Sequence, residues 1–83
     1  MRTIQTKYIG PSNVRGSRIK AWVADEPKMQ ATIPYDHAMD NFHCHLKAAK
    51  ALADKINWHG SYIAGSTKNG YVFVNIETRI ETL

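Results

Sequence analysis

The sequence predicts an α+β fold: an antiparallel sheet of about five strands, in the order β-β-β-α-β-β, with one amphipathic helix packed on one face. Three observations lead to this prediction. Short segments with alternating or β-branched side chains are separated by turn residues, apolar residues recur at helical spacing in the middle of the chain, and an Asn-Gly pair divides the last two extended segments. The 83 residues fit a single domain, predicted to span residues 1–76.

Three strands are predicted before the helix. Residues 3–9 are rich in β-branched and aromatic side chains and are followed by Gly-Pro-Ser-Asn, which favours a turn. Residues 18–24 alternate, so Arg18, Lys20 and Trp22 are expected on one face and smaller apolar residues on the other. After an Asp-Glu-Pro turn the alternation resumes, and Pro-Tyr-Asp then ends the sheet segment because proline supplies no N–H to the ladder.

The helix is predicted over residues 40–57. Asp40 is suited to cap its first turn, with Asp36 as the alternative cap one turn earlier, and Gly60 favours a stop soon after the helix. The stripe expected to be buried consists of residues at helical spacing: Phe42, Leu46, Ala49, Ala53 and Ile56, with His45 and Leu52 beside it. The charged residues on the opposite side of the helix are expected to face solvent.

A hairpin is predicted after the helix. Its strands, residues 61–66 and 71–76, flank Thr-Lys-Asn-Gly, and Asn-Gly tolerates the positive φ angles of a type I′ turn. Residues 77–83 are interpreted as a C-terminal tail.

One helix covers one face of such a sheet and leaves the other face for solvent or for a partner. We expect Val72, Val74 and Ile76 to meet the helix, which turns Tyr71 and Phe73 to the open face. The residues predicted to bind a partner lie on this face and in the loop before it: Arg15, Arg18, Lys20, Trp22, Tyr71 and Phe73.

The charge of the chain indicates an anionic partner. The formal net charge is +4, and five cations precede the first acid, Asp25. Aromatic rings beside cations suit stacking on unpaired bases, and they suit a protein interface equally well. The Gly-containing loop at residues 10–18 lacks the Gly-Lys-Ser/Thr ending of a Walker loop, so a nucleotide cradle is not expected.

A cluster of metal-ligating residue types precedes and opens the helix: His37, Asp40, His43, Cys44 and His45. Three of them are consecutive, and consecutive side chains on a helix point about 100° apart, so they cannot converge on one ion. We therefore predict no metal and no cofactor. Cys44 is interpreted as a solvent-facing thiol without the orienting groups that nucleophilic catalysis needs, and the chain is not expected to be an enzyme.

The expected location is the cytoplasm, without membrane contact. The single cysteine cannot form a disulfide within the chain, no apolar run of about 18 residues is present, and the first residues lack the apolar core of a signal peptide.

Residues 8–21, 32–36 and 69–74 resemble a group of short, mostly uncharacterised bacterial proteins from phages, plasmids and other mobile elements. This resemblance implies action on host machinery, including inhibition of CRISPR or restriction complexes. The sequence therefore predicts a non-enzymatic binding module that inhibits a host protein or nucleoprotein complex through a basic and aromatic surface. The alternatives are a DNA- or RNA-binding protein that uses the same face, and a homodimeric accessory protein.

Overall fold

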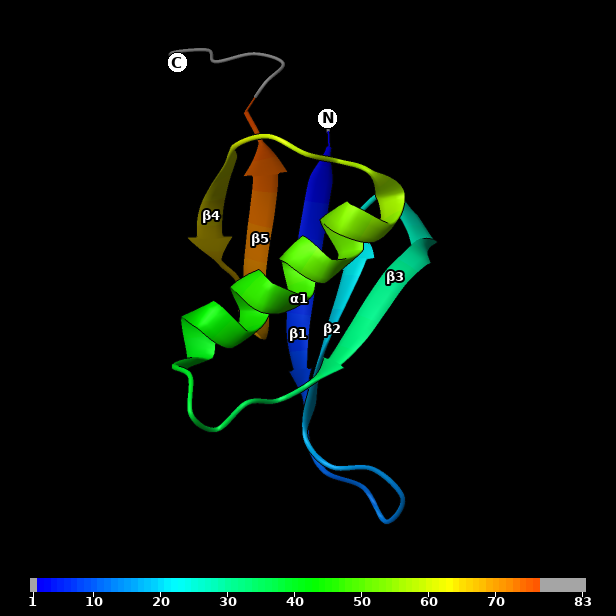
Figure 1. Cartoon of the computed structure of the whole chain (residues 1–83), viewed down its shortest axis with the longest axis vertical. Helices are drawn as coiled ribbons and strands as arrows, with labels where there is room; N and C mark the ends of the chain where they lie inside the picture. The colour runs from blue at the N-terminus through cyan, green and yellow to red at the C-terminus, as the bar shows by residue number, and fades with distance from the viewer. Residues whose placement is uncertain (1, 77–83) are drawn as a thin grey trace.

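The computed structural model describes residues 2–76 and contains five strands and one helix in the predicted order (Figure 1). The elements are β1 (Thr3–Ile9), β2 (Arg18–Val23), β3 (Glu26–Pro34), α1 (Asn41–Ile56), β4 (Tyr62–Ser66) and β5 (Gly70–Asn75). All five strands belong to one antiparallel sheet, so the predicted α+β fold is confirmed. The predicted tail, residues 77–83, lies outside the described residues.

The strand order is β3-β2-β1-β5-β4, which places the first and the last described strand side by side within the sheet. Ile4 of β1 lies between Val23 of β2 and Phe73 of β5. β3 and β4 are the two edge strands. Helix α1 crosses one side of the sheet diagonally and packs against β1, β2, β3 and β5, while β4 lies beyond it (Figure 1).

The helix has the bounds that its capping residues predict. An oxygen of the Asp40 carboxylate accepts a hydrogen bond of 2.8 Å from the backbone N–H of His43, which satisfies one free donor of the first turn. Asn57 follows the last turn in the left-handed conformation, with φ of 61°, and so ends the helix before Gly60 is reached. Within residues 2–76, no helix combines the length and the apolar character needed to cross a membrane.

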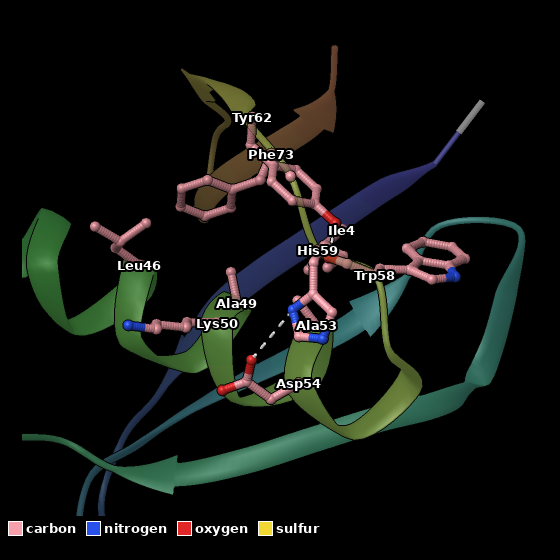
Figure 2. A pocket seen from close by; sticks show the side chains of 11 residues that line it. Ile4, Leu46, Ala49, Lys50, Ala53, Asp54, Trp58, His59, Tyr62 and Phe73 are labelled. Carbon is pink, nitrogen blue, oxygen red and sulfur yellow. Dashed lines mark hydrogen bonds and ion pairs between the residues drawn. The ribbon is translucent and has the colours of Figure 1, made fainter. Parts of the chain in front are cut away.

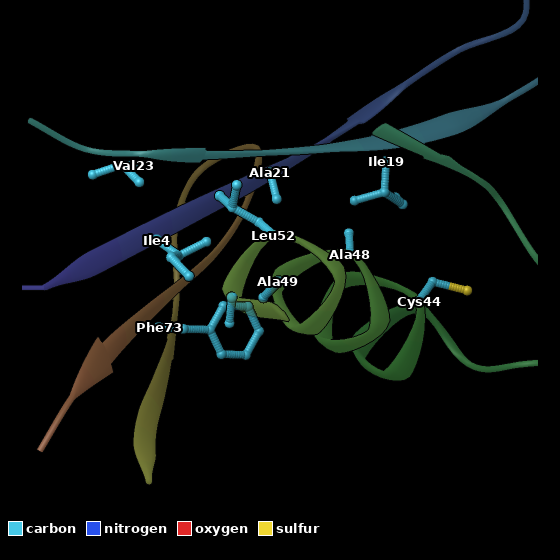
Figure 3. Close-up of a cluster of buried hydrophobic side chains, with 10 residues drawn as sticks. Ile4, Ile19, Ala21, Val23, Cys44, Ala48, Ala49, Leu52 and Phe73 are labelled. Carbon is cyan, nitrogen blue, oxygen red and sulfur yellow. The ribbon is translucent and has the colours of Figure 1, made fainter. Parts of the chain in front are cut away.

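The buried side of α1 differs from the predicted stripe. The fully or nearly buried residues are Cys44, His45, Ala48, Ala49, Leu52 and Ala53. Leu46 is 39% exposed because it lies toward β4 and β5, where the helix leaves the sheet uncovered. Ala48 is fully buried near Ile19 of β2, where a small side chain permits close approach of the helix (Figure 3). Cys44 is 1% exposed, so the prediction of a solvent-facing thiol is wrong.

The phase predicted for β5 is also wrong. Phe73 is opposite Ile4 of β1 and joins it in the core, with 2% of its surface exposed (Figure 3). Tyr71 shares this face and packs its ring against Phe42 of the helix, with 5.2 Å between centroids. Val72 is opposite Gln5 and faces away from the helix. β5 is apolar at successive positions, so its own alternation does not identify the buried side, and the larger aromatic rings fill the space beneath the helix.

The predicted hairpin between β4 and β5 is present, but its glycine serves another purpose. The backbone N–H of Thr67 donates to the carbonyl of Gly70 at 2.9 Å, and neither Asn69 nor Gly70 has a positive φ. A type I′ turn is therefore absent from this position. A Cβ atom at Gly70 would overlap the backbone carbonyl of Thr6, so glycine permits the close approach of β5 to β1.

A buried polar pair joins the helix to the central strand. The hydroxyl of Thr6 lies 2.7 Å from Nδ1 of His45, and both side chains are almost completely buried. Burial disfavours the protonated imidazole and lowers the pKa of His45 below its ordinary value of 6.5. His45 is thus a neutral member of the core, in edge contact with the ring of Tyr71 at 4.9 Å between centroids.

Candidate binding surface

The open face is the side of the sheet that points away from α1. Residues directly opposite one another on neighbouring antiparallel strands share a face, so the register identifies its members. Trp22 is opposite both Gln5 and Gln30, and Lys20 is opposite both Lys7 and Thr32. The structure therefore places Arg18, Lys20 and Trp22 on the open face, as the alternation of their strand predicts.

Two lysines lie side by side on this face. Lys7 of β1 is directly opposite Lys20 of β2, and together with Trp22 and Pro27 they line a hollow of about 140 Å³. Pro27 reaches this position because the register of β2 and β3 shifts between Trp22 and Val23. Lys7 was missed in the sequence, although Ile4-Gln5-Thr6-Lys7 alternates and places it on the polar side of its strand.

The loop between β1 and β2 extends the basic region beyond the sheet (Figure 1). The backbone N–H of Ser12 donates to the carbonyl of Arg15 at 2.7 Å, and the N–H of Arg15 donates to the hydroxyl of Ser12 at 3.1 Å, so this loop has its own turn. Arg15 is an exposed residue of this loop, and the guanidinium of Arg18 donates to the carbonyl of Gly16 at 3.4 Å. We call Lys7, Arg18 and Lys20, with Arg15 in the loop, the basic end of the open face.

The part of the open face formed by β4 and β5 is aliphatic. Val72 and Val74 of β5 lie opposite Gly65 and Ile63 of β4, and Ile63 is 58% exposed. Tyr71 and Phe73, predicted as apolar anchors of this face, lie on the covered side instead. Within residues 2–76, Trp22 is therefore the aromatic residue of the open face. The valines and Ile63 occupy the part of the face where Tyr71 and Phe73 were expected.

The covered side has a groove of its own between α1 and the β4–β5 hairpin. This hollow of about 340 Å³ is mainly apolar, with Leu46, Phe73 and Tyr62 on its walls and Lys50 and Asp54 on its helical rim (Figure 2). The Tyr62 hydroxyl donates to the carbonyl of Trp58 at 2.8 Å and so fixes one wall. The groove exists because a single helix is too narrow to cover five strands.

The histidines and the cysteine are separated by the fold. Within the described residues, no group of three side chains is placed to hold a metal ion. The Cys44 thiol is buried and donates to the carbonyl of Asp36 at 3.2 Å. His43 is exposed beside the Asp40 carboxylate, whose hydrogen bonds from the backbone and ring of His43 lower the pKa of Asp40 below 3.8. The Asp40–His43 contacts cap the helix, and the Cys44 thiol joins its first turn to the segment before it.

The described residues thus offer a mixed basic and aliphatic surface, and an apolar groove on the opposite side. Comparison with protein-family models, with curated proteins and with solved structures finds no match to this chain.

Proposed function

We propose that the protein is a non-enzymatic binding module whose open face holds an acidic surface of a partner protein or nucleoprotein complex. The observation that carries this proposal is the pair Lys7 and Lys20. Like charges directly opposite on neighbouring strands destabilise a sheet. Within residues 2–76, the ion pairs involve Asp40 and Asp54, and no carboxylate pairs with either lysine. An anionic partner relieves this repulsion, so the two lysines favour the bound state.

The aliphatic part of the open face supports a protein partner. Nucleic-acid-binding sheets stack several bases on several aromatic rings, and with Tyr71 and Phe73 on the covered side Trp22 is the ring that the described face offers. Val72, Val74 and Ile63 are instead suited to apolar contacts at the centre of a protein interface, with the basic end at its rim.

The resemblance of residues 8–21 to short proteins of phages and plasmids supports a host complex as the partner. In this proposal the module occupies an acidic surface of a CRISPR or restriction complex and so inhibits it. Charged side chains at the rim speed the encounter, and the aliphatic contacts slow dissociation.

The second candidate function is direct binding of DNA or RNA. The hollow lined by Lys7, Lys20 and Trp22 favours it, because two amines beside an indole suit a phosphate next to a stacked base. Salt dependence distinguishes the two functions. For binding to phosphates, the logarithm of the binding constant falls steeply and linearly with the logarithm of the salt concentration.

The test uses two double variants with the same change in net charge. Lys7→Glu/Lys20→Glu reverses the two opposed lysines of the basic end, and Lys47→Glu/Lys50→Glu reverses two exposed lysines of α1 on the other side of the molecule. Host proteins captured by the tagged wild-type chain are identified by mass spectrometry, and the purified partner is then titrated with each variant. We expect the open-face variant to bind at least ~10-fold more weakly, and the helix variant to bind as the wild type does.

The same variants report inhibition in cells. In a bacterium with an active CRISPR or restriction system, the wild type and the helix variant should raise the plating efficiency of a targeted phage, and the open-face variant should not. Equal partner binding by all three chains would contradict the proposed surface. Tight, strongly salt-dependent binding to oligonucleotides, without a protein partner, would favour the second function.

A further inference from the structure

The two edges of the sheet differ in how well they are protected. On β3, Tyr35 N–H donates to the carbonyl of Ser17, so the backbone groups of Tyr35 point toward β2. Because this direction alternates along a strand, the backbone groups of Gln30, Thr32 and Pro34 point outward. Pro34 has no N–H to offer, and the Lys55 amine donates to the carbonyl of Gln30 at 3.0 Å. The register shift near Trp22 distorts the edge further. Each of these features hinders the addition of another strand.

β4 has none of these protections. The bonds from Ile76 N–H to the Ser61 carbonyl at 3.0 Å and from Thr67 N–H to the Gly70 carbonyl at 2.9 Å belong to the ladder with β5. Alternation therefore directs the N–H and C=O groups of Tyr62, Ala64 and Ser66 away from β5. No described segment covers this edge, and the strand contains neither proline nor a charged residue. An uncharged edge with free backbone groups is a template for strand pairing.

We propose that β4 pairs antiparallel with β4 of a second copy of this chain, about a twofold axis at Ala64. The sequence of the strand is complementary to itself in this register. Ala64 faces Ala64 of the second copy, Tyr62 faces Ser66, and on the open face Ile63 faces Gly65. The exposed Ile63 side chain thus lies over a glycine, which leaves room for it.

Charge permits a second copy to approach at this edge. Each chain carries a formal charge of +4, yet the five residues from Tyr62 to Ser66 are neutral, so the pairing strands meet without repulsion. The twofold operation keeps the two open faces on the same side of the joined sheet and sends the two basic ends in opposite directions along it. The pairing does not depend on the proposed function of the open face.

The dimer is expected to be weak. A pair of five-residue strands buries less than the roughly 1,200–2,000 Å² of a stable interface. Sedimentation equilibrium of the full chain should therefore show a monomer–dimer equilibrium between about 1 µM and about 1 mM. A chain that remains monomeric over this range would overturn the proposal.

Two proline variants place the interface. Ala64→Pro removes an outward N–H from the β4 edge, and Thr32→Pro removes an outward N–H from the β3 edge, so neither takes a bond from the sheet itself. We expect Ala64→Pro to raise the dissociation constant at least ~10-fold, and Thr32→Pro to leave it unchanged. A dimer weakened by Thr32→Pro and not by Ala64→Pro would assign the contact to another surface and overturn the proposal. A dimer that Lys7→Glu/Lys20→Glu dissociates while Ala64→Pro does not would overturn it in the same way.

A charge exchange at the twofold axis keeps the proposal testable if Ala64→Pro fails to fold. Ala64 is exposed, and its side chain would face the same side chain of the second copy. Ala64→Lys and Ala64→Glu should each be monomeric because like charges meet, and an equimolar mixture of the two should dimerise again. A mixture that shows no more dimer than its components would contradict pairing at this position.

Discussion

The covered and open faces of the sheet differ in what their side chains contribute to stability. On the covered face, Ile4, Ala21 and Phe73 are buried against the helix, and each choice of residue favours the folded state. On the open face, Lys7 and Lys20 repel one another across neighbouring strands. Residues that lower the stability of the isolated fold favour an interaction outside it, as proposed for the open face.

The largest contrast is expected between neighbouring residues of β5. Phe73→Ala opens a cavity in the core and should lower the free energy of unfolding by about 3–5 kcal/mol. Val72→Ala, on the open face, should lower it by no more than about 1 kcal/mol. Urea denaturation followed by circular dichroism measures both values. The opposite order would mean that the valines, and not the aromatic rings, meet the helix.

A smaller contrast is expected between two threonines of β1. Thr6→Val keeps the shape of the side chain but leaves Nδ1 of the buried His45 without its partner, which should cost about 1–3 kcal/mol. Thr3→Val, the matched change on the open face, should alter stability by about 0.5 kcal/mol or less. Equal effects of the two changes would show that the Thr6–His45 bond contributes nothing measurable.

The covered face should also make stability depend on pH through His45. Because burial lowers the pKa of His45 in the folded chain, the unfolded chain takes up this proton first as the pH falls. The contribution is therefore complete above pH 6.5 and is lost as the pH falls from 6.5 through the folded-state pKa. The urea midpoint should decrease over this window. The decrease should be smaller in His45→Gln. It should be as large as in the wild type in His37→Gln, which alters an exposed histidine. A decrease that His45→Gln does not reduce would assign the effect to other groups.

The smallest effect is expected on the open face, and with the opposite sign. Lys20→Glu replaces a lysine pair by an ion pair with Lys7 and should raise the free energy of unfolding by about 0.2–1 kcal/mol. The same change should weaken partner binding, while Lys47→Glu on the helix should affect neither quantity. Loss of stability in Lys20→Glu would show that the Lys7–Lys20 pair does not destabilise the fold. It would also remove the main support for the proposed function.

The elements of this fold are predictable because their signals are local. Asp40 and Asn57 lie at the two ends of α1, and the alternation of Arg18-Ile19-Lys20-Ala21-Trp22 assigns the faces of β2 correctly. A capping residue acts on the turn beside it, and the alternation of β2 combines polar and apolar residues with one period.

The errors arise where the local pattern is ambiguous. β5 is apolar on both sides, so the choice between Phe73 and Val72 depends on the helix that it meets. The helix stripe is rotated because α1 crosses the sheet off-centre, which buries Cys44 and exposes Leu46. The pairing of Lys7 with Lys20 follows from the strand order, which no local signal specifies.

The central position of β1 and β5 has a consequence for synthesis of the chain. Ile4 and Phe73, which pack together, are separated by nearly the whole described sequence. On the ribosome, β1 and β2 emerge early, but β1 keeps one unpaired edge and an incomplete core until β5 has also emerged. Folding of this sheet must therefore await β5, and contacts this distant in sequence slow it relative to a helical protein of the same size. The exposed edge of β1 in the nascent chain is the point at which misassembly would begin.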